Sequence, residues 1–341
     1  MNIETISSNF WSNTSPTEKV KYILDQYLYD LLSIEKKGIK IEKKEFEKKI
    51  ADTMNSIILL LEENEELWET ISNIIRENDF FDFFVKSSSF AKHIFEKPYW
   101  YAWDMHLMKK ICDKEILWDS NFERQADDFF LSVPTAESVR QRAKSLFETL
   151  KRLPNRSKVL NLACWPALEV EGFLTVSDKD IDFLLIDNDP LTLQYLKDKQ
   201  FDKRVKIIQA NAFKLNSKRL ANLSNNQKVD LAYSSGLFDY IPHKFAPRIT
   251  KALFDQVKSW WKLIIGNFLE QSEKNSQTKR QRFVMDEILD WKLIYRTPEE
   301  IEFFLSKLNP NEYTYHIWNE YFDTNPNTIM WSIGFIIIHK K

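Results

Sequence analysis

The chain has 341 residues, which is enough for two domains or for one domain with a large extension. Hydrophobic residues make up 43% of the chain and charged residues 29%, and the formal net charge is −2, so no basic excess suggests a nucleic-acid or anionic-membrane partner. Glycine is scarce: there are five glycines against a usual share of roughly 7%, alongside 11 tryptophans. A nucleotide-binding fold normally uses glycine where the backbone approaches a cofactor closely.

The compartment and the absence of several site types follow from simple counts. Two cysteines, Cys112 and Cys164, are too few for a disulfide framework, and residues 1–14 lack the apolar core of a signal peptide. No apolar run reaches the roughly 18 residues that span a bilayer, so we expect a cytoplasmic protein. The five histidines show no metal-ligand spacing, and the sequence contains neither a P-loop nor a nucleophile elbow.

Residues 1–150 have the periodicity of helices. Residues 15–18 (SPTE) form a capping box, and the apolar residues that follow recur at spacings of three and four. Further helices are predicted over about residues 43–63, 66–78 and 82–95, with a break near Gly38. The alternating charges of residues 35–49 are typical of a solvated helix face. These observations predict an all-helical N-terminal domain, with the only plausible joint near residues 150–157.

From Lys158 onward, short apolar runs alternate with helical segments. The runs cover residues 159–164, 181–186, 205–208, 229–233 and 263–268, and two successive strands are predicted at 312–318 and 328–339. Alternation of this kind predicts a parallel sheet with right-handed crossovers. Residues 151–341 are therefore predicted to form an α/β, Rossmann-like domain of the class I methyltransferase type, which ends in an antiparallel strand pair.

Four strand ends carry residues suited to a nucleoside cofactor, because ligands of open α/β sheets bind at the carboxyl ends of the strands. The first end is residues 161–169 (NLACWPALE), and the second is Asp187 with Asn188. A carboxylate there has two oxygens for the two ribose hydroxyls, although an acidic residue after a strand is also a common helix cap. The third end, Asn211 and Ala212, offers an amide and a backbone N–H to an adenine edge, and the fourth is residues 233–240 (YSSGLFDY).

Several segments together resemble a bacterial family of class I S-adenosylmethionine (SAM) methyltransferases, usually described as making a 3-hydroxypalmitic acid methyl ester signal. The family reads approximately L-x-L-G-C-G-P-G-R-E-V, Y-S-A-G-L-F-D-Y and L-D-W-x-L-I-Y-R-T where this chain has LNLACWPALEV (160–170), YSSGLFDY (233–240) and LDWKLIYRT (289–297). Upstream, KPYWYAWD (97–104) resembles K-P-R-G-Y-A-G-D, and SVRQR (138–142) resembles an A-V-R-x-R element. The resemblance covers roughly residues 90–341.

The resemblance implies a set of site residues around SAM. The residues expected to hold the cofactor are Ala163, Cys164, Trp165, Glu169, Asp187, Asn188, Asn211, Ala212, Ser234, Ser235, Gly236 and Leu237. Tyr101 and Asp104 would belong to a cover over the cofactor, and Tyr295 and Arg296 would lie on the substrate side, where the arginine fork suits a carboxylate acceptor. His243 is either a general base near the acceptor or a surface histidine. A nucleophilic role for Cys164 is not expected.

The chain departs from the family at its glycines. Ala163, Trp165 and Ala167 replace the three glycines of the cofactor loop, and Trp100 and Trp103 replace two glycines upstream. An indole at position 165 would either fill the cofactor space or force the loop outward. Aromatic faces also attract sulfonium and ammonium cations, so the tryptophans would equally suit a rebuilt cation box.

Three functions remain open. The first is a SAM-dependent enzyme that transfers a methyl group to a small or acyl carboxylate or hydroxy acid. The second is an enzyme that cyclises SAM to a four-membered amino acid and methylthioadenosine. The third is a catalytically inactive protein that retains the methyltransferase fold for binding or regulation. The place of the Trp165 indole separates the third from the other two. The first 90 residues would serve as a lid, a homodimer surface or a partner site.

Overall fold

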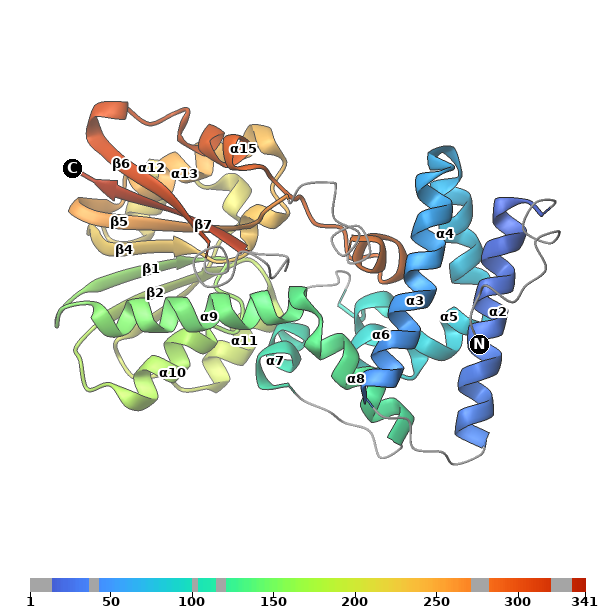
Figure 1. The fold of residues 1–341 in the computed structure, drawn as a ribbon. Helices are drawn as coiled ribbons and strands as arrows, with labels where there is room; N and C mark the ends of the chain where they lie inside the picture. Colours follow the sequence, from blue (N-terminus) through green and yellow to red (C-terminus); the bar gives the residue numbers. More distant parts are fainter. Residues whose placement is uncertain (1–13, 37–42, 100–103, 115–120, 271–281, 320–332) are drawn as a thin grey trace. The chain divides into compact units, whose positions relative to one another are not determined.

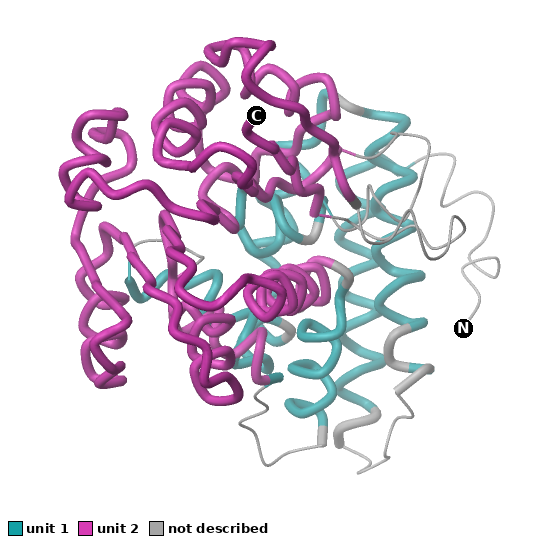
Figure 2. The backbone as a smooth tube through the Cα atoms, turned by 90° about the vertical axis from the view of Figure 1, so that its left-hand side faces the viewer, with its two compact units in different colours: residues 1–102, 114–133, 273–292 teal, residues 103–113, 134–272, 293–341 magenta. Residues whose placement is uncertain are grey.

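The computed structural model describes residues 14–36, 43–99, 104–114, 121–270, 282–319 and 333–341. The chain forms two compact units, coloured separately in Figure 2. The first unit contains residues 1–102, 114–133 and 273–292, and the second contains residues 103–113, 134–272 and 293–341. No helix of the described residues is long and apolar enough to cross a membrane.

The first unit is helical, as predicted. Its main helices are α2 (Pro16–Lys36), α3 (Lys43–Glu62), α4 (Trp68–Glu77), α5 (Asp79–Lys86), α6 (Ser89–Glu96) and α8 (Asn121–Ser132). The predicted capping box begins α2: the Ser15 N–H donates to the Glu18 carboxylate at 3.0 Å, and the Glu18 N–H donates to Ser15 Oγ at 3.4 Å.

The helix predicted over residues 82–95 is wrong in one respect, because the structure divides it into α5 and α6. Ser88 has an extended backbone, and its Oγ accepts the Ala91 N–H at 3.0 Å. The same hydroxyl donates to the carboxylate of Asp127 on α8, at 2.7 Å. A serine that satisfies a free N–H of a new helix favours a helix start over continuation.

The second unit is built on a seven-stranded sheet with the order β3-β2-β1-β4-β5-β7-β6 (Figure 1). The strands are β1 (Lys158–Leu162), β2 (Asp182–Asp187), β3 (Val205–Gln209), β4 (Val229–Ser234), β5 (Val257–Phe268), β6 (Tyr313–Asn319) and β7 (Ile333–Lys340). The first five pair in parallel, whereas β7 pairs antiparallel with both β5 and β6. This mixed sheet confirms the predicted fold class.

Helices cover both faces of the sheet (Figure 1). On one face lie α9 (Pro134–Arg152), α10 (Leu168–Val176) and α11 (Pro190–Asp198), which bury Leu150, Phe173 and Leu196 against it. On the other face α12 (Ser217–Leu223) and α13 (Ala246–Phe254) bury Leu220 and Leu253. Runs that are apolar on both sides, such as residues 183–186 of β2, follow from this two-sided burial.

The division into units differs from the predicted boundary at residue 150. The helices α7 (Met105–Asp113) and α9 belong to the sheet unit, where the Arg140 guanidinium on α9 donates to the Ile111 carbonyl on α7 at 3.0 Å. In contrast, the π-helical segment Val284–Ile288 belongs to the helical unit. The indole N–H of Trp68 donates there to the Glu287 carboxylate at 2.6 Å. Contacts between distant segments, which local periodicity does not record, decide both assignments.

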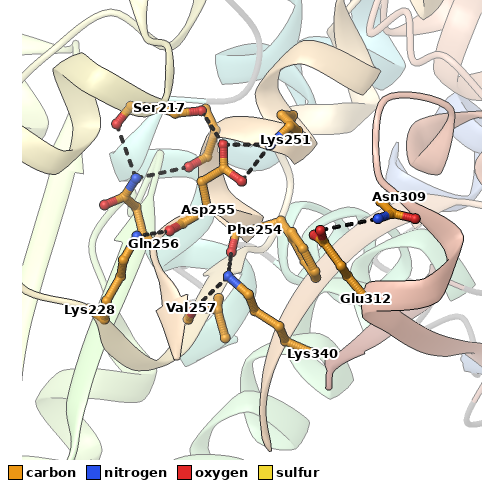
Figure 3. Close-up of polar contacts among 11 residues, drawn as sticks. Ser217, Lys228, Lys251, Phe254, Asp255, Gln256, Val257, Asn309, Glu312 and Lys340 are labelled. Atoms are coloured by element: carbon orange, nitrogen blue, oxygen red, sulfur yellow. Dashed lines mark hydrogen bonds and ion pairs between the residues drawn. The ribbon is translucent and has the colours of Figure 1, made fainter. Parts of the chain in front are cut away.

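The amino end of β5 is closed by polar contacts (Figure 3). The Asp255 carboxylate accepts hydrogen bonds from Ser217 Oγ and Lys251 Nζ, at 2.5 and 2.6 Å. The Gln256 amide donates to the Ser217 carbonyl at 3.1 Å, and Lys340 Nζ donates to the Val257 carbonyl at 3.0 Å. These groups satisfy helix and strand ends at the amino edge of the sheet, whereas ligands of open α/β sheets bind at the opposite, carboxyl edge.

Candidate functional site at the carboxyl edge of the sheet

The strand order identifies the place where a ligand fits this sheet. From β1 the chain moves outward to β2 and β3, and then it returns to β4 on the other side of β1. The loops that leave β1 and β4 therefore diverge, and open α/β sheets bind ligands in the crevice between such loops. In this chain the two loops begin with Ala163 and Ser235.

The loop after β1 has the backbone of a glycine-rich turn without its glycines. Ala163, Trp165 and Ala167 have φ angles of 56°, 48° and 48°, all in the left-handed region that side chains disfavour. The N–H groups of Ala163 and Cys164 both donate to the Ile186 carbonyl at the end of β2, at 2.8 and 3.2 Å. The three predicted replacements thus occupy a loop whose shape still suits glycine.

The indole of Trp165 lies in the crevice. A Cβ atom placed on Gly236, in the loop after β4, would be 2.1 Å from Cη2 of this indole, so the ring lies directly over the glycine. On α9 the guanidinium carbon of Arg142 is 5.4 Å from the centre of a Trp165 ring. The side chain therefore bridges the loops after β1 and β4, and it occupies the space where the strand order reverses.

Asp187 ends β2 as predicted, but its carboxylate is largely used inside the protein. One oxygen accepts the N–H groups of Asn188 and Asp189 at 2.7 and 3.0 Å, and the other accepts the Trp165 N–H at 3.0 Å. A carboxylate has roughly four lone-pair positions, so one remains for a ligand hydroxyl. Burial raises the pKa of Asp187, which opposes the effect of these three hydrogen bonds. The Asn188 side chain is exposed beside it.

The predicted cofactor residue Glu169 lies in a polar group between β1, β4 and α10, and the sequence did not indicate its partners. The Glu169 carboxylate accepts the Tyr233 hydroxyl at 2.6 Å and the Asn161 amide at 3.0 Å. Burial raises the pKa of Glu169, whereas the Tyr233 hydrogen bond lowers it. Asn161 is 1% exposed, and its Oδ1 has no hydrogen-bond partner in the described structure. An unmet acceptor is costly in a protein interior, and so it favours a polar ligand nearby.

Cys164 is buried beside this group and has a free thiol. Burial raises the pKa of Cys164, and the neighbouring carboxylates of Asp187 and Glu169 raise it further. A thiol that stays protonated is a poor nucleophile.

A buried ion pair joins α9 to the loop after β4. Arg142 Nη1 donates to the Asp239 carboxylate at 3.1 Å and to the Ser235 carbonyl at 2.7 Å, and both charged side chains are at most 2% exposed. Burial raises the pKa of Asp239 to about 6 although Arg142 opposes this. Both residues lie in segments that carry the family resemblance, but no sequence pattern indicates that they pair.

The remaining predicted cofactor residues lie at the end of β4 or in the turns after β3 and β4. Ser234 is buried, and its hydroxyl donates to the Leu162 carbonyl at 2.9 Å, which ties β4 to β1. Leu237 is half-buried and begins a 3₁₀ turn directly after Gly236. Asn211 caps another short turn through its Oδ1, which accepts the Phe213 N–H at 2.8 Å, and Ala212 is buried in the core. The Asn211 cap thus uses the amide oxygen that was predicted to address adenine.

The predicted substrate role of Arg296 does not agree with its surroundings. Its side chain is 1% exposed, and it donates to the Phe238 carbonyl at 2.6 Å, to the Asn267 amide oxygen and to the Ile241 carbonyl. The Phe304 ring lies 5.2 Å from its guanidinium carbon. Arg296 is therefore a structural residue that holds the segment after β4. Tyr295 is also buried, with its ring at an edge-to-face angle to Phe268.

Replacing Arg296 with lysine is expected to lower the free energy of unfolding by about 2–3 kcal/mol, because one ammonium does not satisfy acceptors placed for a guanidinium fork. Urea unfolding measures the change, and Arg219→Lys, at an exposed arginine that donates to the Lys214 carbonyl, is the control. Unchanged stability in Arg296→Lys would contradict the structural role of Arg296 and support a role in ligand binding instead.

Two other predicted catalytic residues have local structural partners. Asp104 caps α7, since its carboxylate accepts the N–H groups of His106 and Leu107 at 2.8 and 3.1 Å. His243 stacks on Phe303 with ring centres 4.3 Å apart, which fits the surface-histidine alternative. Tyr101, Trp100 and Trp103 lie outside the described residues.

Comparisons with known proteins agree with the fold. No family model matches the sequence, and no curated relative matches it. A solved structure described as a possible exported protein from Bordetella parapertussis aligns with a TM-score of 0.55 and 13% identity, over 74% of this chain and 86% of that chain. A "putative methyltransferase" from Thermobifida fusca aligns with a TM-score of 0.50 and 16% identity, over 69% and 93%. The chain therefore has a methyltransferase-like α/β fold, in which the seven-stranded mixed sheet follows a helical N-terminal region.

Proposed function

We propose that this chain is built as a SAM-dependent methyltransferase. The observation that carries the proposal is the loop after β1, where residues 163, 165 and 167 all keep a left-handed backbone at the point where the strand order reverses. A backbone of this shape costs free energy with side chains present, and it lets a cofactor approach closely when they are absent. The acid at the end of β2 and the unmet acceptor of Asn161 add polar groups to the same edge.

The cofactor does not fit the crevice while the Trp165 indole lies over Gly236. A free lone-pair position on Asp187 and the unmet acceptor of Asn161 support a nucleoside ligand at the same edge, whereas the indole opposes it. The crevice accepts SAM only if this indole is displaced or absent.

For the acceptor we propose a small or acyl carboxylate or hydroxy acid. This choice rests on the resemblance of residues 233–240 and 289–297 to a family that makes a fatty-acid methyl ester. The buried Arg296 gives it no support, because its donors serve backbone and amide oxygens.

A second candidate function is supported by the Trp165 indole itself. A protein whose crevice is closed by an aromatic side chain would retain the methyltransferase fold as a binding or regulatory module without using SAM. A third candidate is cyclisation of SAM, for which the sequence offers the aromatic residues of a cation box.

Calorimetric titration with SAM and with S-adenosylhomocysteine separates these functions, applied to the unchanged chain, Trp165→Gly and Trp260→Gly. The last variant makes the same substitution in the same unit at an exposed side chain. We expect Trp165→Gly to bind both ligands with micromolar affinity, and the unchanged chain and Trp260→Gly to bind at least tenfold more weakly. Absence of binding by all three proteins at millimolar ligand would overturn the SAM proposal and favour the binding module.

Product analysis on a protein that binds then distinguishes the two enzymes. Methyl transfer yields S-adenosylhomocysteine, and cyclisation yields methylthioadenosine without any acceptor. We expect the first product, formed only when carboxylate or hydroxy-acid acceptors are added.

A further inference from the structure

Two tryptophans have a backbone that suits glycine. Trp165 has a φ of 48°, and Trp260 has a φ of 71°. A bulky side chain in the left-handed region is an outlier, because its Cβ lies too close to the following carbonyl oxygen. Trp165 lies in the loop after β1 and Trp260 lies within β5, so each is an independent observation.

Trp260 lies at an irregularity in β5. Val229 of β4 pairs with Val257 of β5, and the next pair is Leu231 with Lys262. The stretch of β5 between these pairs is therefore longer than the matching stretch of β4. One common class of β-bulge places glycine in the left-handed region, the region that Trp260 occupies here. The Trp260 side chain is 85% exposed, so packing does not account for a tryptophan here.

Among the described residues, every aromatic residue with a left-handed backbone is a tryptophan. The described positions with a positive φ that are neither glycine nor tryptophan are Lys97, Lys114, Arg156, Ala163, Ala167, Gln200, Asn225, Asn226 and Asp290. Phenylalanine and tyrosine number 25 and 12, yet no described residue of either type has such a backbone. General tolerance of aromatic rings would have included them, so the cause is specific to tryptophan.

The composition of the chain is unusual in the same two residue types, glycine and tryptophan. A usual glycine share of roughly 7% would give a chain of this length about 24 glycines. The sequence has five, and its 11 tryptophans outnumber them. Other tryptophans have ordinary surroundings: Trp68 donates to Glu287 and packs edge-to-face on Phe283, and Trp318 stacks on Phe335. Trp68 and Trp318 are therefore explained by their contacts, in contrast to Trp165 and Trp260, whose backbone suits glycine.

We infer that residues 165 and 260 are glycine in the chain as its own cell makes it. The codon UGA supplies a single cause, because it is one base from the tryptophan codon UGG and one base from the glycine codon GGA. Different genetic codes read UGA as stop, as tryptophan or as glycine. A gene whose UGA codons mean glycine would give this sequence when those codons are translated as tryptophan.

The inference has a consequence for the site at the carboxyl edge of the sheet. With glycine at position 165, no indole lies over Gly236, and the crevice between the loops after β1 and β4 is open. The chemical class of ligand that fits it, a nucleoside sulfonium, rests on the function proposed above. The identity of residues 165 and 260 does not rest on that function.

Two measurements test the inference on native material. The first is the gene: we expect UGA at codons 165 and 260, and also at codons 100 and 103, which the sequence resemblance places at glycine positions, with UGG at codon 68. The second is mass spectrometry of the chain purified from its own organism. Its tryptic peptide of residues 159–179 should be lighter by the difference between a tryptophan and a glycine residue, whereas the peptide of residues 50–76, which contains Trp68, should have the mass of the printed sequence.

Either of two results overturns the inference: UGG at codons 165 and 260, or a native peptide 159–179 with the mass of tryptophan. These results are independent of SAM. If glycine is found and the native protein does not bind SAM, the inference stands and the proposed function fails.

Discussion

Replacing Arg142 with methionine is expected to lower the free energy of unfolding by about 3–5 kcal/mol, because it leaves a buried carboxylate without its ion-pair partner. Arg142 and Asp239 are at most 2% exposed, and the pair joins α9 to the loop after β4. The substitution also removes the donor to the Ser235 carbonyl and the cation above the Trp165 ring. Urea unfolding followed by circular dichroism measures the loss.

The loss should depend on pH in a direction set by Asp239. Burial raises the folded-state pKa of this residue to about 6 from an ordinary value of 3.8. An acid whose pKa is higher in the folded chain than in the unfolded chain loses stabilising free energy as the pH rises between the two values. Without Arg142 the folded-state pKa rises further, so the loss continues to higher pH. The difference between Arg142→Met and the unchanged chain should therefore be smaller at about pH 5 than at about pH 8.

Arg140→Met provides the control on the same helix. Arg140 is 12% exposed and pairs with Glu137, so its replacement should cost less and show little change over this pH range. An equal loss for both variants would contradict the role of the buried pair. A loss in Arg142→Met that does not grow with pH would show that Asp239 is not the group left unpaired.

The fold followed from the sequence because each strand and helix of the sheet unit carries its own signal. The apolar runs near residues 159, 181, 205 and 229 each became a strand, and the helical segments between them became crossovers. Burial on both faces favours apolar side chains on both sides of an inner strand, as in residues 183–186 of β2, so the pattern is strong even without glycine turns. Boundaries were weaker where single side chains decide them, as Ser88 does between α5 and α6.

The candidate site followed only in part, because a sequence gives the position of a side chain along the chain and not its partners. Asp187 and Ser234 ended the predicted strands, whereas Arg296 is buried and bonded to backbone carbonyls. An arginine that serves backbone oxygens and one that serves a ligand look alike in sequence. The pair of Arg142 and Asp239 is 97 residues apart, and no local pattern indicates such a contact.

Trp165 shows what the structure adds to the sequence at one position. The resemblance marked it as a replaced glycine, and both a filled crevice and a rebuilt cation box were open. The structure supplies two facts that bear on the choice: the indole lies over Gly236, and the backbone is left-handed. A tryptophan that fills the crevice explains the position of the indole over Gly236. It does not explain the left-handed backbone, because a side chain that only fills space does not require a conformation that its own Cβ disfavours. Glycine at this position explains the backbone.

Replacing Trp260 and Trp68 with glycine is expected to change stability in opposite directions. In Trp260→Gly the relief of left-handed strain raises the free energy of unfolding by about 1–2 kcal/mol. The greater freedom of glycine in the unfolded chain lowers it by about 0.5–1 kcal/mol. Because the side chain is 85% exposed, little packing is lost, and the variant should be as stable as the unchanged chain or up to about 1 kcal/mol more stable.

Trp68→Gly should instead lower the free energy of unfolding by about 2–4 kcal/mol, since a large side chain with fixed contacts is removed and glycine enters the first turn of a helix. The indole N–H donates to Glu287 at 2.6 Å, and its ring packs edge-to-face on the fully buried Phe283. Urea unfolding of both variants beside the unchanged chain gives the two signs. A loss above 1 kcal/mol in Trp260→Gly would show that the exposed indole stabilises β5 and that its backbone is not a glycine backbone. Changes of opposite sign in the free energy of unfolding would show two kinds of tryptophan in this chain. Trp68 is stabilised by its contacts, whereas Trp260 occupies a position whose backbone requires glycine.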